Sequence, residues 1–225
     1  MTTPSQNKSA AISLRTWWWV AFALVAAGLL CVFPPFHVVL KKAGGSADGA
    51  SGAAFDPVAF AAQFWSGPLQ AAAAKAPELP PILAALRRDP AAAAKQHARQ
   101  VGVGGVAYFF ARGSGRVVGV EKSRVLVTID GMEGATIAVH TGPVFGNTVR
   151  DGCGLLEVNR VPGLSEFNAL SAELNRLVEE RVLPTLRSSA TVGTRLAFAG
   201  CAEAPESVGA GPLLTFILVQ AEVIP

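Results

Sequence analysis

A long uncharged stretch near the N-terminus constrains this chain more than any other sequence feature. From Trp17 to Leu40 there is no Asp, Glu, Lys or Arg, and most residues are apolar. A helix that rises 1.5 Å per residue needs about 20 such residues to cross the ~30 Å hydrocarbon core of a bilayer. The three tryptophans that open the stretch suit the headgroup boundary, and Pro34 and Pro35 are expected to end the helix. The sequence therefore predicts a transmembrane anchor over residues 17–40.

Two other interpretations of this segment stay open. A cleaved signal peptide has an apolar region of about 7–15 residues before a small-x-small site, and the apolar run here is longer. In a lipoprotein, Cys31 would carry the lipid, but Leu30 precedes it where lipid-attachment signals have a small residue. An uncleaved anchor is therefore favoured over both.

Charges near the anchor indicate its orientation weakly. Two basic residues precede it and two follow it, so the positive charges are balanced on its two sides. No acidic residue precedes Trp17, which favours a cytoplasmic tail at residues 1–16. We expect a single-pass protein of the inner (cytoplasmic) membrane, with the body facing the periplasm. The inner membrane is thus an expected partner.

Composition excludes two classes of protein. The net charge is only +3, 16% of the residues are charged, and Lys and Arg form no stripe that could contact a series of phosphates. Nucleic-acid binding is therefore not expected. A hydrophobic content of 51% also excludes an intrinsically disordered chain.

A helical region follows the anchor. Residues 41–54 are rich in Gly, Ala and Ser and predict a flexible linker. Asp56-Pro57 and Asp89-Pro90 each place an N-cap acid before a proline at the first helical position. Gly67-Pro68 and the later prolines interrupt the pattern. We therefore expect three or four short helices over residues 55–101.

The residues from 102 to 225 have the composition of strands, rich in Val, Ile, Phe and Thr. Strands are predicted at 106–112, 115–120, 124–129, 136–140, 194–201 and 213–223, with a bend or bulge at Gly113-Ser114-Gly115 joining the first two. An amphipathic helix is predicted over 165–183, with Ser165 as its N-cap and Pro184 at its end. This order of elements is typical of an OB-type barrel, so we predict an α+β protein with an OB-like antiparallel β-barrel and one long helix between its third and fourth strands.

Several segments of the chain resemble the domain-of-unknown-function 2291 family of predicted periplasmic lipoproteins. They are GPVFGNTVRD before the long helix, LSAELNRLV within it, the GSGRVVGVE strand pair and the AEVIP end, and the resemblance covers about residues 55–225. The chain departs from the family pattern at Leu30-Cys31 and at residues 158–162, where the family tends to be aromatic. The resemblance implies an extracytoplasmic domain held at the membrane, often encoded beside sugar-type ABC transporters, and it implies no established activity.

Polar residues gather between the third strand and the long helix, and they are the candidate ligand contacts. These are Asn147, Thr148, Arg150 and Asp151, with Asn175 on the helix and Trp65 as a stacking face. Guanidinium and carboxylate groups can each make two hydrogen bonds to neighbouring sugar hydroxyls. Alternatively, Arg150 and Asp151 satisfy the loop and tie the barrel to the helix through Asn175. Both interpretations stay open at this point.

No catalytic arrangement is evident. His37, His97 and His140 lack the spacing of a metal site, and no nucleophile motif or phosphate loop is present. Cys153 and Cys201 could pair in an oxidising compartment or be two separate buried thiols. We expect no catalytic residue, metal or cofactor. The predicted function is a non-enzymatic, membrane-tethered periplasmic accessory or binding protein associated with an ABC transporter or its sugar substrate; the alternative is an envelope protein-protein interaction scaffold without a small-molecule ligand.

Overall fold

The computed structural model describes residues 55–102, 105–207, 209 and 211–224. The predicted tail, transmembrane anchor and linker lie outside these residues. Within the described ranges, no helix has the length and hydrophobicity that crossing a bilayer requires. The described residues, from Phe55 onward, form one compact unit.

Within the described residues, five helical segments precede the barrel. They are α2 (Pro57–Phe64), the π-helix η1 (Trp65–Leu69), α3 (Gln70–Ala74), α4 (Leu79–Arg88) and α5 (Pro90–His97). Asp56 and Asp89 are the expected N-caps: their carboxylates accept hydrogen bonds from the backbone N–H groups of the first turns of α2 and α5, at 2.9–3.1 Å.

The predicted break at Gly67-Pro68 is wrong, because the helix continues through it. Pro68 has no N–H to donate, and the backbone there widens to a π-helix that joins α2 to α3 without a gap. Trp65, at the start of this π-helix, is buried. The interruption therefore changes the pitch of the helix but does not end it.

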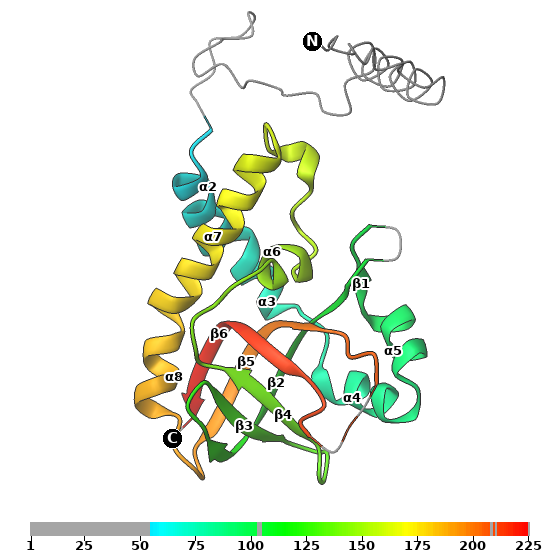
Figure 1. The fold of residues 1–225 in the computed structure, drawn as a ribbon. Helices are drawn as coiled ribbons and strands as arrows, with labels where there is room; N and C mark the ends of the chain where they lie inside the picture. Colours follow the sequence, from blue (N-terminus) through cyan, green and yellow to red (C-terminus); the bar gives the residue numbers. More distant parts are fainter. Residues whose placement is uncertain (1–54, 103–104, 208, 210, 225) are drawn as a thin grey trace, which may run out of the picture. The chain divides into compact units, whose positions relative to one another are not determined.

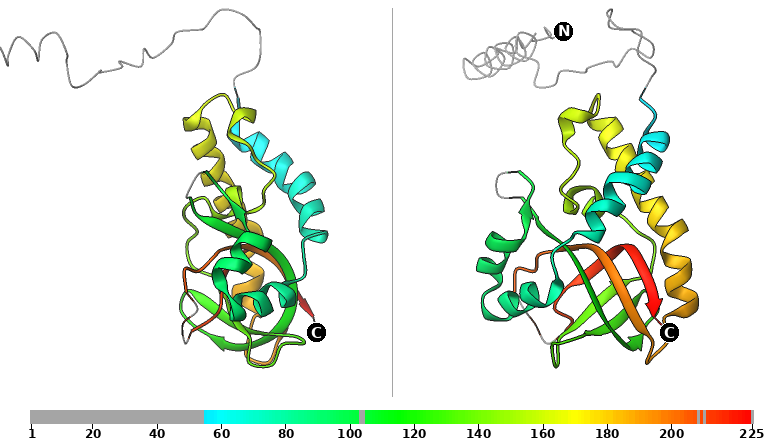
Figure 2. Two further views of the ribbon diagram at one scale, coloured as in Figure 1. Left: turned by 90° about the vertical axis from the view of Figure 1, so that its right-hand side faces the viewer. Right: turned by 180° about the vertical axis from the view of Figure 1, so that it is seen from behind.

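The strands form a closed barrel, shown from three sides in Figures 1 and 2. They are β1 (Arg99–Gln100), β2 (Ala107–Val120), β3 (Arg124–Ile129), β4 (Thr136–His140), β5 (Arg195–Glu203) and β6 (Thr215–Ile224). Their order is β1-β2-β3-β4-β6-β5, and β2 also pairs with β5, which closes the barrel. Among the strands that the structure describes, β4 and β6 are the one pair that runs in parallel. This topology confirms the predicted OB-type barrel.

The predicted bend at Gly113-Ser114-Gly115 is wrong, because β2 is one continuous strand. Its irregularity lies later, between Val117 and Gly119. Glycine is needed here for close approach: a Cβ on Gly115 would lie 2.3 Å from the carbonyl oxygen of Thr128 and 2.8 Å from Cγ1 of Val127. The glycine at position 115 therefore marks tight packing between β2 and β3, and not a bend.

The connection from β4 to β5 is helical. It contains α6 (Thr148–Gly152), the 3-10 turn η2 (Val158–Arg160), α7 (Leu164–Arg181) and α8 (Leu183–Ser189). Gly163 occupies the N-cap position of α7, so the expected cap at Ser165 is wrong. Pro184 lies in the first turn of α8, where the chain leaves α7, as predicted. Of the apolar stripe along α7, only the first residue, Leu164, is exposed, at 68%.

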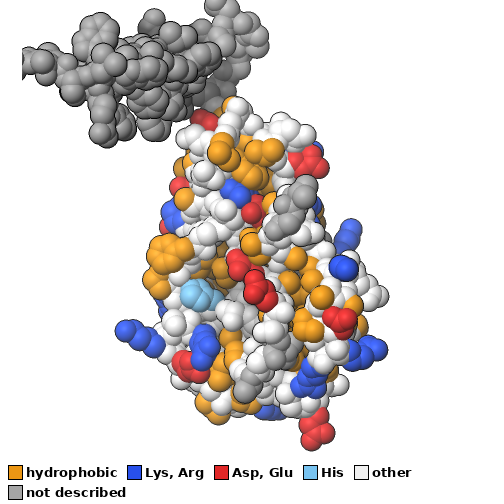
Figure 3. All heavy atoms as spheres, turned by 45° about the vertical axis from the view of Figure 1, so that its right-hand side comes forward, with side chains coloured by type: hydrophobic (Ala, Val, Ile, Leu, Met, Phe, Trp, Pro, Cys, Tyr) orange, Lys and Arg blue, Asp and Glu red, His pale blue; other side chains and the backbone are white. Residues whose placement is uncertain are grey.

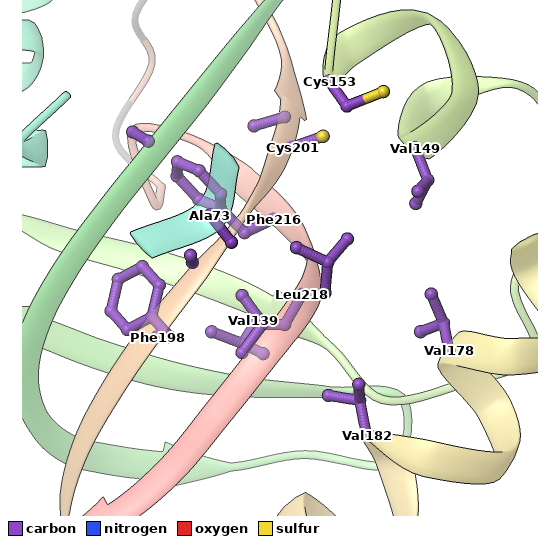
Figure 4. Close-up of a cluster of buried hydrophobic side chains, with 14 of the residues drawn as sticks. Ala73, Val139, Val149, Cys153, Val178, Val182, Phe198, Cys201, Phe216 and Leu218 are labelled. Atoms are coloured by element: carbon purple, nitrogen blue, oxygen red, sulfur yellow. The ribbon is translucent and has the colours of Figure 1, made fainter. Parts of the chain in front are cut away.

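One hydrophobic core joins the barrel to the helices. In Figure 4, Val139, Phe198 and Phe216 lie on strands, and Val149, Val178 and Val182 face them from α6, α7 and the α7–α8 junction. Cys153 and Cys201 belong to the same cluster and are both free thiols. The loop that leads from β4 into α6 is consequently held between two packed layers, which fixes the position of the candidate site.

Candidate functional site

Arg150 is the central residue of the predicted polar cluster, and its guanidinium is fully engaged inside the protein. Its Nε and Nη2 donate to the two carboxylate oxygens of Asp151, at 2.7 and 3.0 Å. Its Nη1 donates to the backbone oxygen of Phe167 at 3.4 Å, and the guanidinium carbon lies 3.9 Å from the centre of the Phe167 ring. Because Arg150 is only 7% exposed, this ion pair lies between α6 and α7.

The asparagines of the cluster also bond within the protein. The side-chain oxygen of Asn147 accepts a hydrogen bond from Ser171 at 2.9 Å, and Nδ2 of Asn175 donates to the carbonyl oxygen of Gly146 at 2.9 Å. Both bonds connect the loop to α7. The geometry thus agrees with the interpretation in which these residues tie the barrel to the helix, and their role as ligand contacts stays a prediction.

Trp65 is not brought together with the other predicted site residues. It is 4% exposed and belongs to the hydrophobic core. A ring in that position packs against apolar side chains and presents no open face for stacking on a ligand. The structure therefore places Trp65 in the packing of the body.

A groove lies beside the polar cluster, on the outside of the barrel. Its volume is about 530 Å³, and one side is formed by the loop from β4 to α6 and the other by the loop from β5 to β6. Thr148 is the one predicted site residue that lines it, and its hydroxyl donates to Oε1 of Glu203 at 3.3 Å. The groove lining further includes His140, Pro143, Phe145, Pro205, Leu213 and Ile217.

Phe145 is the most exposed large apolar residue among those described, at 79%. The neighbouring Val144 is buried, and its backbone N–H donates to the carboxylate of Glu179 at 2.7 Å. Gly146 then adopts a φ of +80°, a backbone conformation that favours glycine. The anchored valine and the left-handed glycine together turn the Phe145 ring outward at the edge of the groove.

The polar groups of the groove are few. Nε2 of His140 lies 2.9 Å from the carbonyl oxygen of Pro143, and the carboxylate of Glu203 lies near the buried Tyr108. Burial, followed by the negative charge of Glu203, raises the pKa of Tyr108. On the face drawn in Figure 3, acidic and basic side chains are mixed among hydrophobic ones and form no large patch of one sign.

The sequence pattern missed Phe145, His140 and Glu203 as members of one site. The one available signal was the phenylalanine between Pro143 and Gly146, since an aromatic residue in a turn is an unusual place for a core side chain. Glu203 is the last residue of β5 and lies 55 residues after Thr148 in the sequence, so only the fold brings it near the loop.

The fold and the groove define the class: an α+β protein built on an OB-type barrel, with a shallow, partly apolar site at one side. The chain belongs to the DUF2291 family, described as predicted periplasmic lipoproteins, whose model matches residues 23–211. This membership confirms the family resemblance and supports a membrane-associated body in the periplasm.

The fold has a solved counterpart. A crystal structure of an OB-fold protein from Thermotoga maritima superposes with a TM-score of 0.66 and 23% sequence identity, covering 76% of this chain and 100% of that chain. The likeness establishes the fold. The search of curated proteins finds no match. Among the described residues, no group of three or more His, Cys, Asp or Glu side chains is placed to hold a metal ion.

Proposed function

We propose that the protein is a non-enzymatic accessory protein of the periplasm, held at the inner membrane, that binds a sugar in the groove beside Phe145 and works with an ABC-type uptake system. The observation that carries the proposal is the exposed Phe145 ring beside a groove that also holds the Glu203 carboxylate and His140. The family membership supports the periplasmic location.

The chemistry of the groove suits a small polyhydroxylated ligand. An aromatic ring can pack against the apolar C–H face of a sugar, while a carboxylate accepts hydrogen bonds from its hydroxyls. A volume of about 530 Å³ lies within the range of roughly 300–1,000 Å³ that is usual for small-molecule sites. The predicted contacts at Asn147, Arg150, Asp151 and Asn175 would then act indirectly, by holding the loop that carries Phe145.

A thermal-shift screen of residues 53–225 against monosaccharides tests the proposal. A ligand at 100 times its Kd stabilises by about 2.7 kcal/mol, which raises the Tm of a domain of this size by roughly 5–10 °C. Phe145→Ala should abolish the shift without lowering the Tm of the free protein, because the ring is exposed. Val192→Ala, at a residue that is also exposed and lies outside the groove, is the matched control and should keep the shift.

The alternative function is the envelope scaffold, in which Phe145 contacts a protein. Silence of the whole sugar panel, together with loss of a co-purifying membrane protein in the Phe145→Ala variant, would favour the scaffold over the sugar site.

A further inference from the structure

Exposed aliphatic side chains gather at the end of the body where the described chain begins. Val58 lies in the first turn of α2, Val158 in η2 and Leu164 at the start of α7, and all three are about half exposed or more. The views in Figures 1 and 2 agree that the first turn of α2, η2 and the start of α7 lie at the same end. We call these three residues, with the exposed Pro162 and Arg160 of the same turn, the tip.

Leu164 shows that this exposure needs an explanation. It opens the apolar stripe of α7, whose other members, Phe167, Leu170, Leu174 and Leu177, are buried. α7 packs along α2, and Leu164 lies beyond the point where the rest of the stripe is covered, at 68% exposure. Three exposed aliphatic side chains on elements that share one end of the body are a feature of surfaces that contact something apolar.

The segment that precedes Phe55 indicates which apolar surface the tip contacts. Residues 41–54 separate the uncharged stretch at 17–40 from Phe55. The uncharged stretch at 17–40 or a lipid on Cys31 would hold the other end of this linker in the bilayer. Because Phe55 follows the linker directly, the tip is the part of the body that a membrane attachment keeps nearest to lipid. Tethering raises the effective concentration of the tip at the lipid surface, so a weak apolar contact is enough for the tip to bind lipid.

We infer that the tip is a membrane-contact surface, at which Val58, Val158 and Leu164 insert into the outer layer of the lipid surface to which the chain is tethered. Apolar side chains at such an interface are buried about 5–10 Å deep, at the boundary between headgroups and acyl chains. The inference rests on the membrane association of the body and is independent of the groove, so either can fail without the other.

The charges at the tip predict which lipids it prefers. Asp56, Glu157 and Glu166, which flank the tip residues in the sequence, are acidic, whereas Arg160 of the tip is basic. The carboxylate of Asp56 is occupied by the first N–H groups of α2, and the guanidinium of Arg160 can bond one lipid phosphate. Attraction to anionic lipid is consequently not the source of the contact, and zwitterionic lipid should serve at least as well.

An environment-sensitive fluorophore at the tip tests this inference. Residues 41–225 are attached through an N-terminal hexahistidine tag to phosphatidylcholine vesicles that contain nickel-chelating lipid. The probe is placed at Leu164→Cys, while the native Cys153 and Cys201 are shielded from labelling by burial. Val192→Cys is the matched control, because Val192 is equally exposed, at 67%, in the turn between α8 and β5 at the other end of the body.

The expected result is a blue shift and at least a twofold rise in emission at position 164 when vesicles are added, with quenching by lipids that carry a spin label near the headgroup. Position 192 should not change. Equal emission at 164 with and without vesicles would overturn the inference, and so would a probe that is already shifted in solution, since the linker or a second copy would then cover the tip.

A variant and a second lipid complete the test. Val158→Ser in the probe-labelled chain should lower the vesicle-dependent rise at 164 by at least half, because it removes a neighbouring apolar side chain. Exchanging a fifth of the phosphatidylcholine for phosphatidylglycerol should leave the rise unchanged or reduce it. A rise that instead grows with phosphatidylglycerol and disappears in high salt would show a charge contact and contradict an apolar one.

Discussion

At the scale of single residues, the ion pair of Arg150 and Asp151 shows how a polar sequence motif can be structural. The two side chains are about nine-tenths buried and joined by two hydrogen bonds. Removing the arginine leaves a carboxylate without its partner in a low-dielectric environment, which costs about 3–5 kcal/mol.

Arg150→Ala should therefore lower the free energy of unfolding by about 3 kcal/mol or more, measured by urea titration. Arg176→Ala is the matched control, because Arg176 makes two ion pairs with Glu173 and Glu180 on the exposed face of α7. Exposed pairs contribute at most about 1 kcal/mol. If Arg150→Ala kept its stability but lost the response to sugar, the direct ligand role of Arg150 would be restored.

Cys153 gives a pH-dependent prediction. Burial raises the pKa of its thiol from 9.0 to about 11, so the folded protein favours the neutral form. The associated stability is present in full below about pH 9 and is lost as the pH rises towards 11. Equilibrium unfolding between pH 8 and 11 should show this decline, with a smaller slope in Cys153→Ala.

The raised pKa of Cys153 also reduces its thiolate fraction about 100-fold near neutral pH, so alkylation of the folded protein should be slow.

At the scale of elements, the sequence predicted β3, β4 and the course of α7 closely, because alternation and the three-to-four spacing report on burial of one face. It failed where a residue type has two uses. The glycines at Gly113-Ser114-Gly115 predict a bend or bulge, although Gly115 serves the close approach of β3. Proline in the first helix was interpreted as a terminator, although Pro68 is accommodated in a π-helix.

Two glycine substitutions separate these uses. Gly115→Ala should destabilise strongly, by about 2 kcal/mol or more, because its Cβ would overlap backbone and side-chain atoms of β3. Gly67→Ala should be neutral or stabilise by up to about 1 kcal/mol, since no atom lies within 4 Å of the added Cβ and the position is helical. Thermal unfolding of both variants checks the contrast, and equal effects would refute the packing explanation for β2.

At the scale of the whole described body, the OB-type order of elements followed from the sequence, but the groove did not. Topology depends on the succession of periodic segments, which is local information. The groove depends on Phe145 and Glu203, from two separate segments of the chain, lining the same hollow, and no local pattern encodes that arrangement.

The barrel closes unevenly. β5 pairs along most of its length with both β2 and β6, whereas β4 and β6 are in register only at Ala138–Thr215 and Val139–Phe216. Hydrogen exchange should therefore be faster for the backbone amides of Ala138 and Phe216 than for those in the middle of β5. Uniform protection around the barrel would contradict this expectation.

This short parallel pairing also lies at the groove. His140 and Thr215, which line the groove, lie at the two strands of the weakest seam in the barrel wall. A molecule in the groove would contact both strands at this pairing, through His140 of β4 and Thr215 of β6. An occupant of the groove should therefore slow hydrogen exchange at the backbone amides of Ala138 and Phe216.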